Sequence, residues 1–308
     1  MIPVNSVLQV GSFPEMMQAE VDQRLKAVRL TNPHDPVPAG TFEAILTRSS
    51  TPIPTALLQQ IPGLKVIACC GVGYDNLPLD YLKEHGIQAS TTPGVLNDAV
   101  CELGIGLMFA LLRNLPAADQ FVRSGQWPKA IFPIATTLAG KTVGIVGLGR
   151  IGQDLAKRLT PFGVQIAYFG PSQKDVPYAF FNSVSALAKA CDILILTCPG
   201  GPETEKIINA EVLEALGSKG FLVNIARGSV VDEPALLSAL SQKRIAGAAL
   251  DVFENEPSPD AAFMKLDNVV LAPHIGSATS ETRQAMTRLA IQNLEAFFRQ
   301  QPLLTPIK

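Results

Sequence analysis

The stretch VGIVGLGRIG, residues 143–152, constrains the fold of this chain more than any other segment. An apolar run leads into Gly147, Gly149 and Gly152 at G-x-G-x-x-G spacing, and an amphipathic segment follows. This context predicts a strand, a tight turn and a helix. In such a unit the first glycine permits the turn, the second lets the backbone approach a pyrophosphate, and the third lets the helix pack on the strand. We therefore expect a dinucleotide-binding unit; the alternative is a tight turn that binds no cofactor.

Two stretches of the chain alternate apolar runs with helical segments. In the second stretch six runs are expected to be strands, at residues 141–149, 164–170, 192–199, 221–226, 245–253 and 268–274. In the first stretch, four are expected at residues 6–11, 42–48, 64–73 and 86–91. Strands that alternate with helices over short loops indicate parallel sheets with crossover helices. The predicted class is α/β, with two doubly wound parallel-sheet (Rossmann/flavodoxin-like) domains and an active-site cleft between them.

Two long helices are expected to separate and rejoin these domains. Residues 97–116 are apolar nearly all round, which is typical of a buried helix, here one that crosses between domains. Residues 279–299 form a second long helical pattern that leads back to the first domain. Because 308 residues are too many for one comfortable core, we predict a substrate-binding (catalytic) domain at 1–97 plus 282–308. A dinucleotide-binding domain is then expected at 98–281.

Composition narrows the classes of function. The net charge is −2 and no basic block occurs, which argues against a nucleic-acid partner. No apolar run is long enough for a transmembrane helix, and the N-terminus does not resemble a signal peptide, so a cytoplasmic protein without a membrane partner is expected. The five cysteines form no C-x-x-C pair and lie mostly in apolar runs. They are expected to be buried thiols, and no metal site is predicted.

The end of the second strand of the dinucleotide unit determines which cofactor is expected. An NAD site places an acidic side chain there to bind the ribose 2′-OH. This chain has Gly170, Ser172 and Lys174 in that loop, which lack the carboxylate that would repel a 2′-phosphate. A hydroxyl donor and a cation favour NADP(H), with NAD(H) as the alternative. An ordinary polar loop, or a longer loop in which Asp175 supplies the acid, also remains open.

Three polar residues follow later strands of the same domain. Arg227, Glu256 and His274 come after the apolar runs at 221–226, 245–253 and 268–274. Ligands of open α/β sheets bind at the carboxyl ends of the strands, so these side chains are expected to converge. Arg can bind a carboxylate through two hydrogen bonds, and His can donate a proton near neutral pH. A carboxylate bonded to an imidazole favours its charged form and sets its tautomer, a role expected for Glu256.

Several motifs together resemble the D-isomer-specific 2-hydroxyacid dehydrogenases over nearly the whole chain. They are GLGRIG, NIARGSVVDEPALLSAL, AGAALDVFENEP, NVVLAPHIGSAT, CCGVGYDN and TTPGVLNDAVCE. The resemblance implies that Arg227 binds the substrate carboxylate and carbonyl, that Glu256 orients His274, and that His274 is the proton donor. It implies that the backbone of Val72 and Gly73 grips the substrate carboxylate. It also places Asp251 near the nicotinamide carboxamide. Further cofactor contacts are predicted at Arg150, Ile151, Pro171, Cys198, Pro199, Thr204, Ile225, Ala226 and Gly276.

Within that family the chain looks most like the glyoxylate/hydroxypyruvate and hydroxyphenylpyruvate reductases. Relatives that use NADPH often carry an Arg where Pro171 stands here, which is a departure that weakens the NADP(H) prediction. The family implies a homodimer, and residues 123–132 fall in its dimer-arm region. Trp127 is predicted either to reach the partner's substrate site or to be a simple interface residue.

The expected function is reduction of a small 2-keto acid, such as glyoxylate or hydroxypyruvate, to the D-2-hydroxy acid with NADPH. One alternative is an NADH-dependent dehydrogenase for a bulkier, phenylpyruvate-type keto acid. Another is a non-catalytic protein that senses the dinucleotide, because some relatives act as corepressors and keep the same residues. A turnover assay separates these readings.

Overall fold

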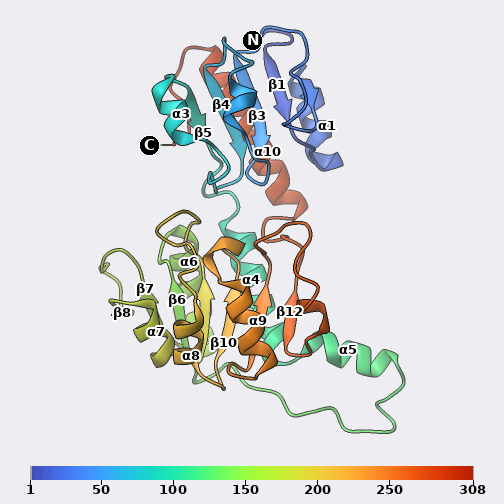
Figure 1. The fold of residues 1–308 in the computed structure, drawn as a ribbon, viewed down its shortest axis with the longest axis vertical. Coiled ribbons are helices and arrows are strands. Elements are labelled where there is room, and N and C mark those ends of the chain that lie inside the picture. Colours follow the sequence, from blue (N-terminus) through green and yellow to red (C-terminus); the bar gives the residue numbers. More distant parts are fainter. Residues whose placement is uncertain (1, 308) are drawn as a thin grey trace. The chain divides into compact units, whose positions relative to one another are not determined.

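A computed structural model describes residues 2–307 of the chain, which divide into two compact units (Figure 1). Unit 1 comprises residues 2–96 and 277–307, so that it is built from both ends of the chain, and unit 2 comprises residues 97–276. Each unit contains one parallel sheet with helices on both faces. The predicted two-domain parallel α/β class is confirmed.

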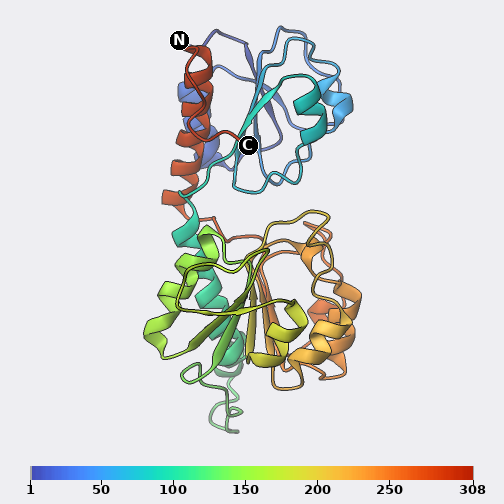
Figure 2. The ribbon, with the colours of Figure 1, turned by 90° about the vertical axis from the view of Figure 1, so that its left-hand side faces the viewer.

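Unit 1 contains a five-stranded parallel sheet in the order β2-β1-β3-β4-β5. Its strands are β1 (Val7–Val10), β2 (Val28–Leu30), β3 (Ala44–Arg48), β4 (Val66–Cys70) and β5 (Gln88–Ser90). Helices α1 (Glu15–Arg24) and α10 (Ser280–Phe298) lie side by side on one face, as Figure 2 shows. Helices α2 (Thr55–Leu58) and α3 (Leu79–Glu84) pack on the other face. Successive residues of a strand point to opposite faces, so Leu46 packs toward α10 while Ile45 packs toward α2.

Unit 2 contains a seven-stranded parallel sheet in the order β12-β11-β10-β9-β6-β7-β8. Its strands are β6 (Thr142–Val146), β7 (Gln165–Phe169), β8 (Ala179–Phe181), β9 (Ile193–Leu196), β10 (Phe221–Asn224), β11 (Gly247–Leu250) and β12 (Val269–Leu271). The chain runs outward from β6 to β8, then returns and runs outward on the other side from β9 to β12. The order of the strands therefore reverses between β6 and β9, which is where ligands bind in sheets of this kind.

Helices cover both faces of this second sheet. Helices α7 (Val184–Ala190), α8 (Ala210–Leu216) and α9 (Glu233–Ser241) contribute to the apolar core on one face. Helices α4 (Asn97–Leu112) and α6 (Arg150–Leu159) contact each other, and α4 lies against β10, β11 and β12. Helix α4 approaches closely, since a Cβ on Gly104 would lie 2.8 Å from the Ile225 side chain. This packing holds the loop after β10 firmly against a helix.

The structure corrects three details of the sequence predictions. The helix expected at 97–116 ends at Leu112, and α5 (Leu115–Arg123) starts after a break at Asn114, whose φ is 48°. Helix α4 is not buried all round, because Asp98, Glu102 and Gly106 are exposed along one stripe. The strands β2 and β8 were not expected; both are three-residue edge strands with few buried side chains.

Helices α4 and α5 also matter for the question of membrane crossing. No single helix within residues 2–307 is long and apolar enough to cross a membrane. Among the described residues, α4 and α5 taken together meet the criteria of length and composition, but the two helices are bent by 61°.

Candidate functional site

The glycine loop after β6 is shaped by two close backbone approaches and one open position. Gly147 has a φ of +96°, and a Cβ there would lie 2.7 Å from the Cys198 backbone nitrogen. A Cβ on Gly152 would lie 2.3 Å from the Gly147 carbonyl oxygen. By contrast, a Cβ on Gly149 would meet no atom within 4 Å. Two glycines thus allow the turn and the close packing of α6, and the third leaves open the space that a Cβ would fill.

Helix α6 begins directly at this open position. Gly149 is its N-cap residue, and its first turn, Arg150 to Gln153, carries no acidic side chain. The first N–H groups of a helix lack acceptors within the helix, and the helix dipole favours an anion beside them. The Thr197 hydroxyl donates a 2.6 Å hydrogen bond to the Gly147 carbonyl and so holds the turn. The residues present therefore fit a pyrophosphate; Thr197 is a supporting residue that the sequence analysis missed.

The loop after β7 is tethered by a buried tyrosine. Tyr168 is completely buried, and its hydroxyl oxygen accepts a 2.7 Å hydrogen bond from the Lys174 N–H. Pro171, Ser172 and Asp175 are exposed, and a Cβ on Gly170 would meet no atom within 4 Å. The loop thus presents a hydroxyl and a cation around an open position. Tyr168 was read from the sequence only as part of a strand.

The loop after β10 carries Arg227 and is held by a buried amide. The Asn224 side chain, 1% exposed, donates to the Arg227 carbonyl at 2.9 Å and accepts from the Ala226 N–H at 3.0 Å. The Arg227 guanidinium donates to the Ala226 carbonyl at 2.7 Å and is half-buried. Ile225 and Ala226 are buried. Asn224 thus fixes the backbone from which Arg227 projects.

His274 and Glu256 form a close hydrogen-bonded pair. The distance from His274 Nδ1 to Glu256 Oε2 is 2.6 Å, and both side chains are about one-third exposed, at 35% and 31%. The other Glu256 oxygen accepts from the Phe253 N–H at 3.1 Å. Burial opposes ionisation of Glu256, but its hydrogen bonds and the nearby positive charges outweigh burial and lower its pKa from the usual 4.5. Arg227 is one of those positive charges.

Asp251 holds the turn that carries His274. Its two carboxylate oxygens accept from the N–H groups of Ile275 at 2.7 Å and Gly276 at 2.8 Å. Its carbonyl accepts from the His274 N–H at 2.8 Å. Burial raises the pKa of Asp251, and the two N–H donors act against that rise. His274 has a φ of +53°, a conformation uncommon outside glycine, so these three bonds hold an otherwise unfavourable backbone.

The segment after β9 packs against the glycine turn, where the Cys198 backbone lies next to Gly147. The Thr204 hydroxyl donates to the Pro199 carbonyl at 2.7 Å, which makes the segment compact. Burial raises the pKa of the Cys198 thiol to about 11, so this cysteine is a neutral packing residue at ordinary pH. Four of the five cysteines are buried and Cys191 is half-buried, as expected from the apolar runs that contain them.

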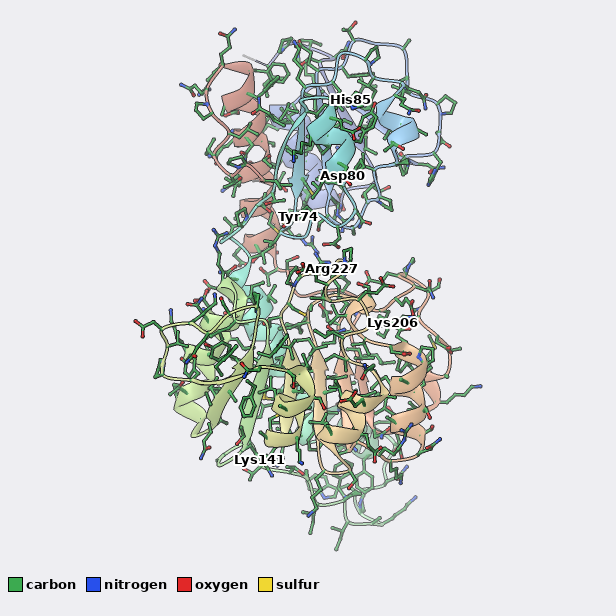
Figure 3. All side chains as sticks on the ribbon, turned by 60° about the vertical axis from the view of Figure 1, so that its left-hand side comes forward. Tyr74, Asp80, His85, Lys141, Lys206 and Arg227 are labelled. Atoms are coloured by element: carbon green, nitrogen blue, oxygen red, sulfur yellow. The ribbon has the colours of Figure 1, made fainter. Side chains whose placement is uncertain are left out.

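In unit 1, Val72 and Gly73 lie just after β4 and are half-buried. The preceding Gly71 is hydrogen-bonded on both sides by Thr92, which accepts from the Gly71 N–H at 2.9 Å through its hydroxyl and donates its own N–H to the Gly71 carbonyl at 2.7 Å. Thr92 is completely buried. Tyr74, labelled in Figure 3, follows this loop and is exposed.

Unit 2 thus gathers its chemical groups at one end of its sheet. Arg227 follows β10, Glu256 follows β11 and His274 follows β12, which are adjacent parallel strands. Figure 3 shows Arg227 and Lys206 at this end of the unit and Lys141, which precedes β6, at the other. A fixed cation beside a carboxylate–imidazole pair can bind an anionic substrate and donate a proton to it. The same end of the sheet carries the loop that fits a pyrophosphate.

Comparison with known families identifies the same region. Residues 105–276 match the model of the D-isomer specific 2-hydroxyacid dehydrogenase NAD-binding domain. This range includes the glycine loop and extends through the turn that carries His274.

Named relatives match over most of the chain. It is 43% identical over 307 residues to a hydroxyphenylpyruvate reductase of Plectranthus scutellarioides, with 98% of each chain covered. It is 45% identical over 270 residues to a 2-ketogluconate reductase of Gluconobacter oxydans, with 87% of each covered. Among solved structures, an NADPH-dependent glyoxylate/hydroxypyruvate reductase from Sinorhizobium meliloti, in complex with NADP and malonate, superposes with a TM-score of 0.94. The two share 39% identity over 99% of this chain and 97% of the other.

Proposed function

The chain belongs to the D-isomer specific 2-hydroxyacid dehydrogenase family, and we propose that it reduces a small 2-keto acid to the D-2-hydroxy acid with NADPH. The observation that carries this proposal is the 2.6 Å His274–Glu256 pair, close to Arg227 and in the same unit as a glycine loop that fits a pyrophosphate. Relatives named for glyoxylate, hydroxypyruvate and 2-ketogluconate support the substrate class.

We propose NADP(H) as the preferred cofactor and NAD(H) as the weaker one. The solved reductase from Sinorhizobium meliloti contains NADP. In this chain Gly170 leaves open space at the end of β7, and Lys174 supplies a positive charge in the same loop. The variant Gly170→Asp tests this preference. Its carboxylate would repel a 2′-phosphate and accept a hydrogen bond from a ribose hydroxyl, so the ratio of kcat/KM with NADPH to kcat/KM with NADH is expected to fall.

The proposed mechanism assigns one role to each polar group. When it is bound, the nicotinamide supplies the hydride that reduces the substrate carbonyl carbon. Arg227 binds the substrate carboxylate and polarises the carbonyl oxygen. Because Glu256 engages Nδ1 of His274, Nε2 is the ring nitrogen that gives a proton to the developing alkoxide. The ionised Glu256 stabilises the charged imidazole before that transfer and holds the ring in place.

We propose that the backbone at Val72 and Gly73 also binds the substrate carboxylate, as the family resemblance implies. Support within unit 1 comes from the way Thr92 fixes the preceding Gly71 by two hydrogen bonds. A fixed backbone offers N–H groups without a further loss of conformational entropy on binding. This contribution would appear mainly in KM for the keto acid.

We propose that the protein is a homodimer joined through α5 and the segment that follows it. Helix α5 contains no buried residue, and Figure 1 shows it extending away from the sheet of unit 2. Trp127, Ile131 and Ile134 are 69%, 95% and 101% exposed, which is unusual for large apolar side chains on a free surface. A second copy would cover this apolar surface. Ile131→Glu with Ile134→Glu is expected to give a monomer by light scattering.

We propose a cytoplasmic location. All five cysteines are free, which fits a compartment that keeps thiols reduced.

The first experiment follows the absorbance of NADPH and of NADH with glyoxylate, hydroxypyruvate, 2-ketogluconate and hydroxyphenylpyruvate in parallel. NADPH-dependent turnover of a small acid is the expected result. Turnover only with NADH and the aromatic acid would assign the chain to the bulkier-substrate alternative. Tight cofactor binding without turnover of any keto acid would instead indicate a dinucleotide-sensing protein.

A further inference from the structure

Glu233 is a buried acid in an unusual place. It is the first residue of α9, where an acidic side chain is normally exposed and interacts favourably with the helix dipole. Here the residue is only 6% exposed. Burial raises the pKa of Glu233, and nearby acidic side chains raise it further. Burying a carboxylate is unfavourable unless it is hydrogen-bonded, so its bonding partner shows what it does.

That partner is the backbone of the segment that carries Glu256. Glu233 Oε1 accepts a 2.7 Å hydrogen bond from the Glu254 N–H. The neighbouring Phe253 N–H donates to Glu256 itself, at 3.1 Å. Two successive N–H groups of residues 253–256 are therefore taken by two carboxylates, of which one comes from α9 and one belongs to the segment.

The same segment packs against the loop that carries Arg227. A Cβ on Gly228 would lie 1.9 Å from the Phe253 carbonyl carbon and 2.0 Å from its oxygen. The residue directly after Arg227 thus contacts the backbone of the residue directly before Glu254. A displacement of residues 253–256 would move Glu256 away from His274 and loosen the contact with the Arg227 loop.

We propose that Glu233 is a positioning residue, which fixes residues 253–256 so that Glu256 meets His274 Nδ1 in the orientation needed for proton transfer. This inference rests on the proposed function only for its kinetic readout. Glu233 acts on the His274–Glu256 pair through the Glu254 N–H, the hydrogen bond that joins α9 to this segment. The length of the Glu233 side chain, which brings its oxygen to the Glu254 N–H, fixes the segment; its negative charge is not required.

Two substitutions separate reach from charge. Glu233→Asp keeps the charge and shortens the side chain by one methylene, so it no longer reaches the Glu254 N–H. Glu233→Gln keeps the reach and an acceptor oxygen and loses the charge. We expect kcat to fall about 10²-fold in Glu233→Asp, which is the scale for a misplaced catalytic group. In Glu233→Gln we expect kcat to stay close to the wild-type value. Glu211→Asp, an exposed acid in the first turn of α8, is the matched control and should be silent.

The pH profile gives a readout that a loss of stability would not move. In Glu233→Asp, Glu256 loses the bonding to His274 that lowers its pKa, so the acid limb of kcat/KM moves to higher pH. Glu233→Gln removes only the negative charge of Glu233. Since like charges raise each other's pKa, the pKa of Glu256 falls slightly and the acid limb moves slightly to lower pH. The charged groups around the two carboxylates are His274, Arg227, Glu254, Asp260 and, beside Glu254, Lys206.

Hydrogen exchange at the Glu254 amide tests the contact without any assay of activity. Protection should drop in Glu233→Asp and persist in Glu233→Gln, with NADPH affinity unchanged in both. If the wild type turns over and Glu233→Asp has the same kcat, the positioning role is overturned and the proposed function stands. The same conclusion follows if kcat falls equally in Glu233→Asp and Glu233→Gln. If the wild type has no turnover, the proposed function fails, and the exchange result alone decides on the contact. Should Glu233→Asp not fold, Glu233→Gln decides: a near-normal kcat with the acid limb moved slightly to lower pH supports the role, and a large loss of kcat refutes it.

Discussion

The loops after β4 in unit 1 and after β10 to β12 in unit 2 occupy equivalent positions in two parallel sheets but are held by different chemistry. In unit 1 the neutral Thr92 holds Gly71 by its hydroxyl and its backbone. In unit 2 the supporting groups are the Asn224 amide and carboxylates, among them Asp251 with two N–H donors. The loop in unit 1 presents backbone groups, whereas the loops in unit 2 present Arg227 and His274.

This difference indicates how each kind of loop responds to pH. A neutral hydrogen bond holds a backbone loop equally well at any pH in the working range. A carboxylate that supports a cationic loop also stabilises its positive charge, and its own ionisation then depends on that charge. Chemistry that needs charge is therefore concentrated in unit 2, and the following predictions test that division.

The largest effect is expected at His274. Asn tolerates the left-handed backbone that His274 adopts, so His274→Asn removes the proton donor with little strain. We expect kcat to fall by ~10²–10⁴-fold, the range for a general acid. Steady-state kinetics and NADPH fluorescence titration measure it, with unchanged cofactor affinity as the control. A variant that turns over normally would remove the chemistry from unit 2 and break the comparison.

A smaller loss is expected for Arg227→Lys. Lysine keeps the charge but cannot make the bidentate contact with a carboxylate. We predict a fall in kcat/KM of about 10²-fold, comparable to the loss of one transition-state donor. Lys141→Gln, at the opposite end of the unit 2 sheet, is the control and should keep wild-type kinetics (Figure 3). Equal activity of Arg227→Lys and wild type would show that charge alone suffices.

Asp251→Asn tests the carboxylate support. Its amide nitrogen would face one of the two N–H donors and leave it unsatisfied, which costs about 1–3 kcal/mol in the free energy of unfolding. The pKa of Asp251 is raised in the folded protein, so protonation favours folding, and this contribution is lost as pH rises through the folded-state pKa. The stability gap between wild type and variant should therefore widen as pH falls toward 3.8, the ordinary value. Urea titrations at several pH values measure it; a gap that narrows instead would refute the sign.

The smallest and simplest effect is expected for Thr92→Val. The Gly71 N–H loses its acceptor, which destabilises unit 1 by about 1 kcal/mol, the low end for an unsatisfied buried donor because the lost bond joined two neutral groups. Because a hydroxyl does not titrate here, this loss should stay constant over the same pH series, and NADPH affinity should not change. A loss that varied with pH as in Asp251→Asn would erase the distinction between the two kinds of loop.

Much of the fold could be read from local patterns. All ten expected strands and both long helical patterns correspond to elements of the structure, since alternation and apolar runs report burial directly. The edge strands β2 and β8 were not predicted from the sequence. Three-residue strands with few buried side chains form through pairing with a neighbouring strand rather than through their own sequence. The break between α4 and α5 was not predicted either, because the apolar pattern continues past Asn114.

The sequence by itself determined the parallel α/β class, the glycine turn and the family, and it proposed Arg227, Glu256 and His274 as site residues, because spacing and residue chemistry are properties of the chain alone. Only the tertiary structure decided how those residues are supported. Glu233 and Glu254 are 21 positions apart, and Asp251 and Gly276 are 25 apart. A hydrogen bond between such positions depends on how crossover helices return successive strands to one edge of the sheet. Without that packing, Glu233 would be an ordinary exposed acid in the first turn of a helix.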